Sequence, residues 1–112
     1  MKQTRYVILR DIQEAGGSRL LSASLTNEGD VLIEGRDFGD GVARFTGSRE
    51  YEWAWRIPHT AVSALQHALG IRPPDDLLLA LQAQFSGENA AELGNFLETH
   101  DIPTTRWSRL GD

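Results

Sequence analysis

The eight residues from position 50 to position 57 read EYEWAWRI and decide the fold class of this chain. Apolar side chains alternate strictly with mostly charged ones, which is typical of a β-strand with one buried and one solvated face. The apolar set consists of Tyr51, Trp53, Trp55 and Ile57. A strand with one solvated face favours an antiparallel sheet, because all-parallel sheets need long crossovers and cover on both faces.

The sequence before this stretch predicts three more strands. Short β-rich runs lie at residues 6–9, 19–26 and 31–36. The segment Asn27-Glu28-Gly29-Asp30 separates the second run from the third and is a hairpin signal, because Asn and Gly tolerate the positive φ of tight connections. We therefore expect an antiparallel four-stranded meander.

The sequence after Ile57 predicts two or three helices. Val62, Leu65 and Leu69 recur at helical spacing and end at Gly70. A second helix is expected after Pro73-Pro74-Asp75-Asp76, and a third, shorter one over about residues 90–99. Strands followed by helices indicate an α+β fold with the helices packed on one sheet face. The tail from Ile102 to Asp112 adds an edge strand or packs across the sheet.

The tryptophans of the aromatic strand are expected to pack against these helices. Trp53 and Trp55 should be buried, with Trp107 as the possible exception, because the apolar helix stripes need an apolar surface opposite them. The long loop from Phe38 to Arg49 is either a packed connection or a binding element.

Composition indicates one globular domain spanning residues 1–112. Cysteine is absent, which excludes disulfides and thiolate chemistry from this sequence. The first apolar run, Tyr6 to Leu9, is too short for a signal-peptide core or a membrane span. We expect a cytoplasmic protein that does not contact a membrane.

No motif in the sequence predicts catalytic, cofactor-binding or metal-binding residues. The tripeptide Asp37-Phe38-Gly39 lacks the partner motifs that give it meaning in kinases. His59, His67 and His100 are too far apart in sequence for a local pair of metal ligands. The sequence favours a non-enzymatic role and leaves the question of an enzyme open.

The charge distribution supports the leading functional hypothesis. The net charge is −5, and residues 57–112 contain 3 basic and 7 acidic residues. We expect a small non-catalytic interaction module, an immunity- or antitoxin-like partner of a basic protein. Its binding residues would be Asp75, Asp76, Glu88, Glu92 and Glu98.

Two other hypotheses remain open from the residues alone. The first is a single-stranded nucleic-acid-binding protein that uses the sheet face, with Arg10, Arg36 and Arg56 beside the aromatic strand. The second is a ligand-binding or enzymatic domain whose site is assembled from residues distant in sequence. The identity of the protein partner and the oligomeric state are left open by the sequence.

Two resemblances accompany these hypotheses. Residues 32–39, 50–53 and 107–112 resemble a group of small actinobacterial proteins of uncharacterised function. More weakly, residues 6–10, 31–36 and 57–69 are similar to two strands and the helix of the PC4-like single-stranded-DNA-binding fold. That second resemblance implies a four-stranded meander followed by a helix, and a role in binding single strands.

Overall fold

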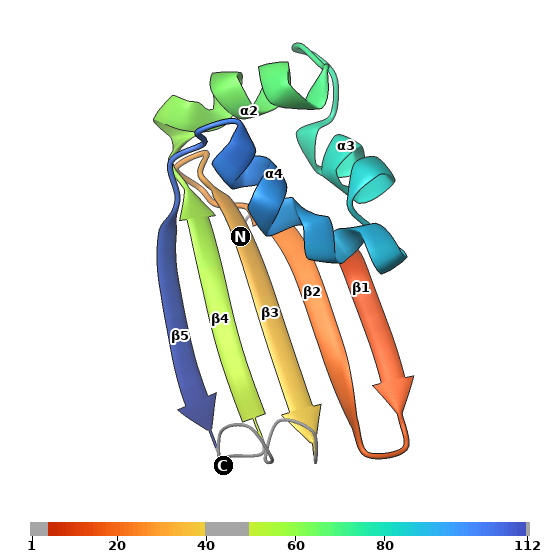
Figure 1. Cartoon of the computed structure of the whole chain (residues 1–112). Helices are drawn as coiled ribbons and strands as arrows, with labels where there is room; N and C mark the ends of the chain where they lie inside the picture. The colour runs from red at the N-terminus through yellow and green to blue at the C-terminus, as the bar shows by residue number, and fades with distance from the viewer. Residues whose placement is uncertain (1–4, 40–49, 112) are drawn as a thin grey trace.

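Within residues 5–39 and 50–111, which the computed structural model describes, five strands form one antiparallel sheet (Figure 1). Their order across the sheet follows their order in the chain. The strands are β1 (Tyr6–Glu14), β2 (Gly17–Leu25), β3 (Val31–Gly39), β4 (Glu50–Ile57) and β5 (Thr105–Gly111). The central strand is β3, and β1 and β5 form the two edges.

The helical segments follow β4 and gather over one end of the sheet (Figure 1). They are η1 (His59–Ala61), α2 (Val62–Leu69), α3 (Leu77–Gln84), η2 (Gly87–Glu92) and α4 (Leu93–Thr99). Gly70 ends α2 in the left-handed conformation, with a φ of 77°. Asp76 caps α3 by accepting a hydrogen bond from the backbone N–H of Leu79. Among the described residues, no helix has the length and apolar character needed to cross a bilayer.

The prediction of an α+β fold with an antiparallel sheet followed by helices is confirmed. The predicted number of strands is corrected, because β5 pairs with β4 and adds a fifth strand to the described sheet. This is the edge-strand alternative for the tail. All side chains from Thr105 to Leu110 are exposed, so β5 has no alternation of buried and exposed positions that sequence analysis could detect.

The two faces of the sheet differ in their cover. The face that carries the buried residues Val31 and Ile33 packs on the helices, and we call it the helix face. The opposite side, which no described helix covers, is called the open face. Its residues on β3 are Leu32, Glu34, Arg36 and Phe38.

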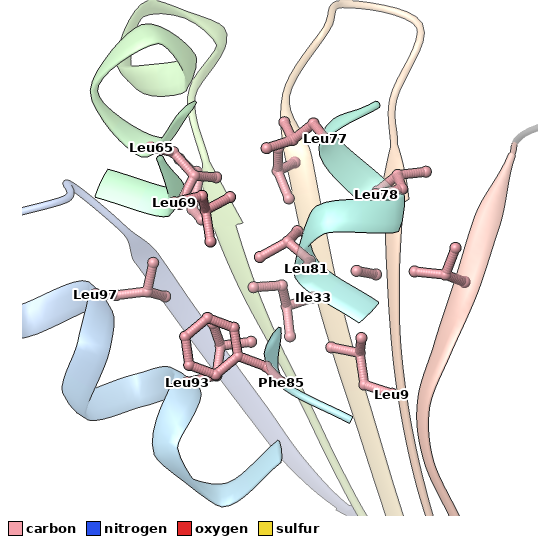
Figure 2. Close-up of a cluster of buried hydrophobic side chains, with 14 of the residues drawn as sticks. Leu9, Ile33, Leu65, Leu69, Leu77, Leu78, Leu81, Phe85, Leu93 and Leu97 are labelled. Carbon is pink, nitrogen blue, oxygen red and sulfur yellow. The ribbon is translucent and has the colours of Figure 1, made fainter. Parts of the chain in front are cut away.

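The hydrophobic core lies between the helix face and the helices (Figure 2). Leu78 and Leu81 of α3 are completely buried and pack in one cluster with Ile33 of the central strand. Leu65 of α2 and Leu93 of α4 belong to the same cluster. Burial of each such side chain contributes about 1.5–3 kcal/mol, so this cluster is the main source of stability.

Trp53 and Trp55 are half-buried, which corrects the expectation of full burial. The helices reach over only one end of the sheet, so β4 leaves their cover along its length (Figure 1). The ring of Trp55 lies against α4, where a Cβ added to Gly94 would be 2.8 Å from Cη2 of Trp55. The ring of Trp53 fills the space above Gly35 of the neighbouring strand. Trp107 is exposed to 52%.

Substitution of Gly94 tests the contact between α4 and Trp55. Alanine in a helix interior is ordinarily more stable than glycine by about 1 kcal/mol. Gly94→Ala should nevertheless reduce the free energy of unfolding by about 1 kcal/mol, because the added methyl group must displace the Trp55 ring. Asn95→Ala, at the next and exposed position, should raise it by about 0.5 kcal/mol. Urea unfolding followed by circular dichroism measures both values, and a Gly94→Ala variant that gains stability would contradict this packing.

Candidate functional site

An open groove lies on the helix face where the cover of the helices ends. Its volume is about 410 Å³, and it is lined by Tyr51, Trp53 and Trp55 of β4 and by Arg106, Trp107 and Ser108 of β5. The alternation of β4 places its aromatic side chains on one face. Pairing with β5 sets Arg106 opposite Trp55 and Ser108 opposite Trp53. Because the Ser108 side chain is small, space remains beside the indole of Trp53.

The floor of the groove is aromatic. The ring centroids of Trp53 and Trp55 are 4.7 Å apart, and their planes are inclined by 39°. The guanidinium carbon of Arg106 lies 4.9 Å from the ring centroid of Trp55. The face of an indole ring attracts cations, and the pair of Arg106 and Trp55 is a contact of this kind within the chain. Its surface suits a partner group that is flat or cationic.

Arg106 also connects the groove to the helices. Its guanidinium lies 3.7 Å from the carboxylate of Glu98 in α4. Both side chains are largely exposed, so this ion pair contributes little to folding stability. The pair does balance the positive charge of Arg106 at the rim of the groove.

Two of the five carboxylates predicted to bind a basic partner have local structural roles. Asp76 caps α3 and forms an ion pair with Arg5. The backbone N–H of Leu79, followed by Arg5, holds the pKa of the Asp76 carboxyl below its ordinary value. The neighbouring Asp75 accepts a hydrogen bond from the backbone N–H of Arg72.

The other three predicted carboxylates lie along η2 and α4. Glu88, Glu92 and Glu98 are all exposed. Within the described residues, Glu88 and Glu92 form no ion pair, and Glu98 pairs only with Arg106. These three carboxylates therefore form the part of the predicted acidic set that remains available to a partner, and Glu98 joins it to the groove.

The three arginines of the nucleic-acid hypothesis do not share a sheet face. A β-bulge between Ile8 and Arg10 shifts the register of β1, so Arg10 lies opposite Leu21 on the helix face. Arg36 and Arg56 lie on the open face instead. Burial, followed by the charge of Arg19, lowers the pKa of Arg10. The Arg10 Nε is buried and has no hydrogen-bond partner among the described residues.

Arg36 and Arg56 on the open face are already paired with carboxylates. Arg36 lies 3.3 Å from Glu50 and 2.9 Å from Glu52. Arg56 lies 2.9 Å from the carboxylate of Asp30. These pairs balance the positive charge that a phosphate backbone would otherwise meet.

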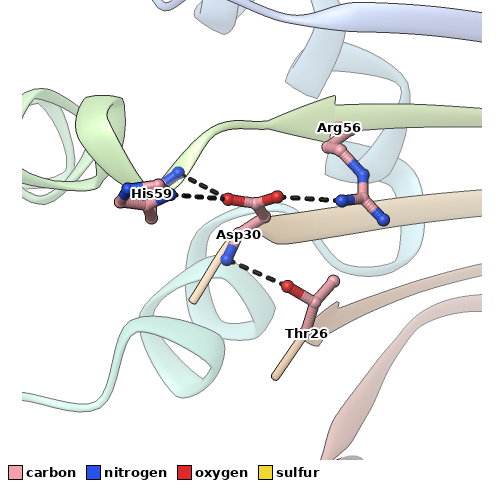
Figure 3. A network of polar contacts seen from close by, with 4 residues as sticks. All are labelled: Thr26, Asp30, Arg56 and His59. Atoms are coloured by element: carbon pink, nitrogen blue, oxygen red, sulfur yellow. Dashed lines mark hydrogen bonds and ion pairs between the residues drawn. The ribbon is translucent and has the colours of Figure 1, made fainter. Parts of the chain in front are cut away.

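A polar network around Asp30 joins two chain segments that are distant in sequence (Figure 3). Asp30 is only 8% exposed, and its carboxylate accepts hydrogen bonds from the backbone N–H of His59 at 2.7 Å and from Arg56 at 2.9 Å. The Nδ1 atom of His59 lies 3.2 Å from the same carboxylate. The backbone N–H of Asp30 donates to the hydroxyl of Thr26. The network fastens the β2–β3 turn to the start of η1.

The pKa of Asp30 lies below its ordinary value. The largest cause is the hydrogen bond from the His59 backbone, and the His59 side chain and the Arg56 guanidinium act in the same direction. Burial raises the pKa and is second in size only to that backbone hydrogen bond, but the lowering effects together outweigh it. Asp30 is therefore held as an anion whose acceptor sites are occupied, which fits a structural role.

No local signal in the sequence indicates this network or the groove. The sequence around Asp30 predicts only a hairpin turn, because the partners of Asp30 lie near residue 59 and no local motif links the two places. The histidines do not converge: His59 contacts Asp30, and the His100 ring packs at a tilt against Phe96 with centroids 4.5 Å apart. In residues 5–39 and 50–111, no group of three His, Asp or Glu side chains could hold a metal ion. Most of the loop from Phe38 to Arg49 lies outside the described residues.

Comparisons of this chain with protein-family models, with curated proteins and with solved structures find no significant match. The two resemblances stated from the sequence therefore stay predictions.

Substitution of Asp30 should produce a pH-dependent loss of stability. Because the pKa of Asp30 is lower in the folded state than in the unfolded state, its stabilising effect is complete above the unfolded value and is lost as the pH falls through the folded value. Asp30→Asn should therefore be clearly less stable than the parent at pH 7, and the difference should shrink below about pH 4. Glu28→Gln, an exposed charge in the same turn, is the control and should show no such loss at pH 7. Urea unfolding at several pH values measures the difference, and a difference that grows toward low pH would contradict the assignment.

Proposed function

We propose that this chain is a non-catalytic binding module that takes up a basic segment of a protein partner in the aromatic groove. The observation that carries the proposal is the groove itself, with its Trp53–Trp55 floor and its link to α4 through the pair of Arg106 and Glu98. An aromatic floor attracts Lys and Arg side chains through their charge and packs against their apolar stems.

The distribution of charge supports a basic rather than an acidic partner. Residues 57–105 contain six acidic residues and one basic residue, Arg72, so they carry the whole net charge of −5. The arginines on the open face are paired with carboxylates of the same sheet or turn. An approaching basic protein would therefore be attracted toward the helices and the groove beside them, and such steering acts mainly on the association rate.

An immunity- or antitoxin-like role is the form of this function that we favour. A protein of this kind covers a cationic surface of its target, and the exposed Glu88, Glu92 and Glu98 would supply the complementary charge. A cytoplasmic location belongs to the same proposal. Asp75 and Asp76 take part less directly, because their carboxylates already hold the start of α3.

One observation favours a second candidate, the binding of single-stranded nucleic acid. The tilted pair of Trp53 and Trp55 with Arg106 above it offers bases a surface on which to stack. The acidic helices beside the groove oppose a phosphate backbone, so we rank this candidate second.

Selection from a library of random 12-residue displayed peptides tests the proposal directly. Peptides retained by the protein should be enriched in Arg and Lys together with aromatic residues. An enriched peptide should bind more weakly as salt rises, because the attraction of exposed charges is screened within about 10 Å at 0.1 M salt. A short single-stranded oligonucleotide is tested in parallel.

Two variants of β5 separate the groove from the rest of the surface. Ser108→Arg fills the groove with bulk and positive charge, and should weaken binding of the selected peptide at least tenfold. Thr105→Arg adds the same charge to the same strand on the open face and should leave binding unchanged. Retention of acidic peptides, or of the oligonucleotide in preference to every peptide, would overturn the proposal.

A further inference from the structure

The open face exposes a set of large apolar side chains. Four described residues of this kind project from it, and their exposed fractions are 60% for Tyr6, 37% for Leu20, 41% for Phe38 and 52% for Trp107. They come from four different strands, so the apolar surface extends across the whole sheet. Exposed apolar surface of this extent marks an interaction site more often than an isolated hydrophobic residue does.

The central strand carries a self-complementary pattern on this face. Its successive open-face residues are Leu32, Glu34, Arg36 and Phe38. Consider a twofold axis that lies between two stacked sheets, parallel to both, and passes over β3 between Glu34 and Arg36 at right angles to the strand. This axis would set Glu34 of one copy against Arg36 of another. The same axis would set Leu32 against Phe38. Because Glu34 is exposed and forms no ion pair within the described residues, the contact would supply it with one.

The same axis matches residues on the neighbouring strand. The register places Arg56 beside Leu32 and Glu50 beside Phe38, so the rotation that exchanges Leu32 with Phe38 also brings Arg56 opposite Glu50. An acidic residue again meets a basic one.

On the edge strand the axis sets an aromatic ring against a cation. Trp107 and Arg109 occupy the two middle positions of β5 on this face, so the rotation places the Trp107 ring of one copy against Arg109 of the other. The guanidinium of Arg109 already lies 5.8 Å from the Trp107 ring centroid within one chain, which is the geometry of a cation–π contact. Three strands thus support one and the same axis.

The open face is large enough for a stable dimer. Five strands spaced about 4.8 Å apart and about eight residues long present roughly 650 Å² of flat surface. Two such faces would bury roughly 1,300 Å² together, which exceeds the approximately 1,000 Å² expected of a specific interface. Sheets that pack face to face keep their strands within about 30° of each other, which is compatible with this axis.

From these observations we infer that the open face binds a second copy of this chain, sheet against sheet, about a twofold axis between Glu34 and Arg36. The face would not attract a partner with a strong charge of one sign, because acidic and basic residues are mixed across it. An identical face supplies the opposite charge at Glu34, Arg36, Glu50 and Arg56, and an aromatic ring at Arg109. This surface lies on the other side of the sheet from the Trp53–Trp55 floor of the groove, and Trp107 on the edge strand contributes to both surfaces.

Charge exchange on the central strand tests the inference. Sedimentation equilibrium of the parent protein at about 100 µM should give twice the chain mass of 12.4 kDa, because interfaces of this size bind with micromolar or better affinity. Glu34→Lys places cations on both sides of the axis, and Arg36→Glu places carboxylates on both sides. Each variant alone should raise the dissociation constant at least tenfold. An equimolar mixture of the two variants should recover a dimer, because the lysine introduced in one variant then meets the glutamate introduced in the other.

Controls separate misfolding and the groove from this result. Far-UV circular dichroism of each variant must match that of the parent, and Glu92→Lys, which places the same substitution on η2, should not alter the mass. Ser108→Arg should likewise remain a dimer, so loss of peptide binding in this variant tests the groove independently of the dimer. A parent protein that remains a monomer at about 100 µM, a Glu34→Lys variant that dimerises like the parent, or a mixture that fails to recover the dimer would each overturn the inference.

Discussion

The close approach of α4 to β4 at Gly94 is the contact on which the rest of the arrangement depends. Only a residue without a side chain lets the helix meet the ring of Trp55 at this distance. The contact places α4 directly against the aromatic row of β4. Trp53 and Trp55 both pack partly against the core and also line the groove, which Tyr51 extends. One glycine in the first turn of α4 therefore lets the helix pack on the same aromatic row that forms the candidate binding surface.

The sequence predicted those elements that are fixed by neighbouring residues, or that bury one face and expose the other. The alternation of β4, the left-handed Gly70 and the helix cap at Asp76 could all be read from neighbouring residues. The fifth strand could be predicted only as one of two alternatives for the tail, because β5 is exposed on both faces and depends on the edge of β4 for its hydrogen bonds. The bulge in β1 was equally hidden, although it decides which face Arg10 joins.

The candidate sites were the hardest features to predict, for the same reason. The groove needs the register of β4 against β5, and the Asp30 network needs the β2–β3 turn to meet η1. Both depend on contacts between residues far apart in sequence. What the sequence did indicate was the separation of charge: balanced pairs on the sheet, and an uncompensated negative charge on the helical segment. The two proposed interaction surfaces follow this division, one for a basic partner and one for an identical chain.

The position of β5 at the edge has a consequence for dynamics. This strand is held by backbone hydrogen bonds on one side only, and its side chains from Thr105 to Leu110 bury little surface. It should therefore open at a lower free energy than the central β3, and its amide hydrogens should exchange with solvent earlier. Because β5 also forms one wall of the groove, this local opening would let the wall yield to occupants of different width while the aromatic floor on β4 stays in place.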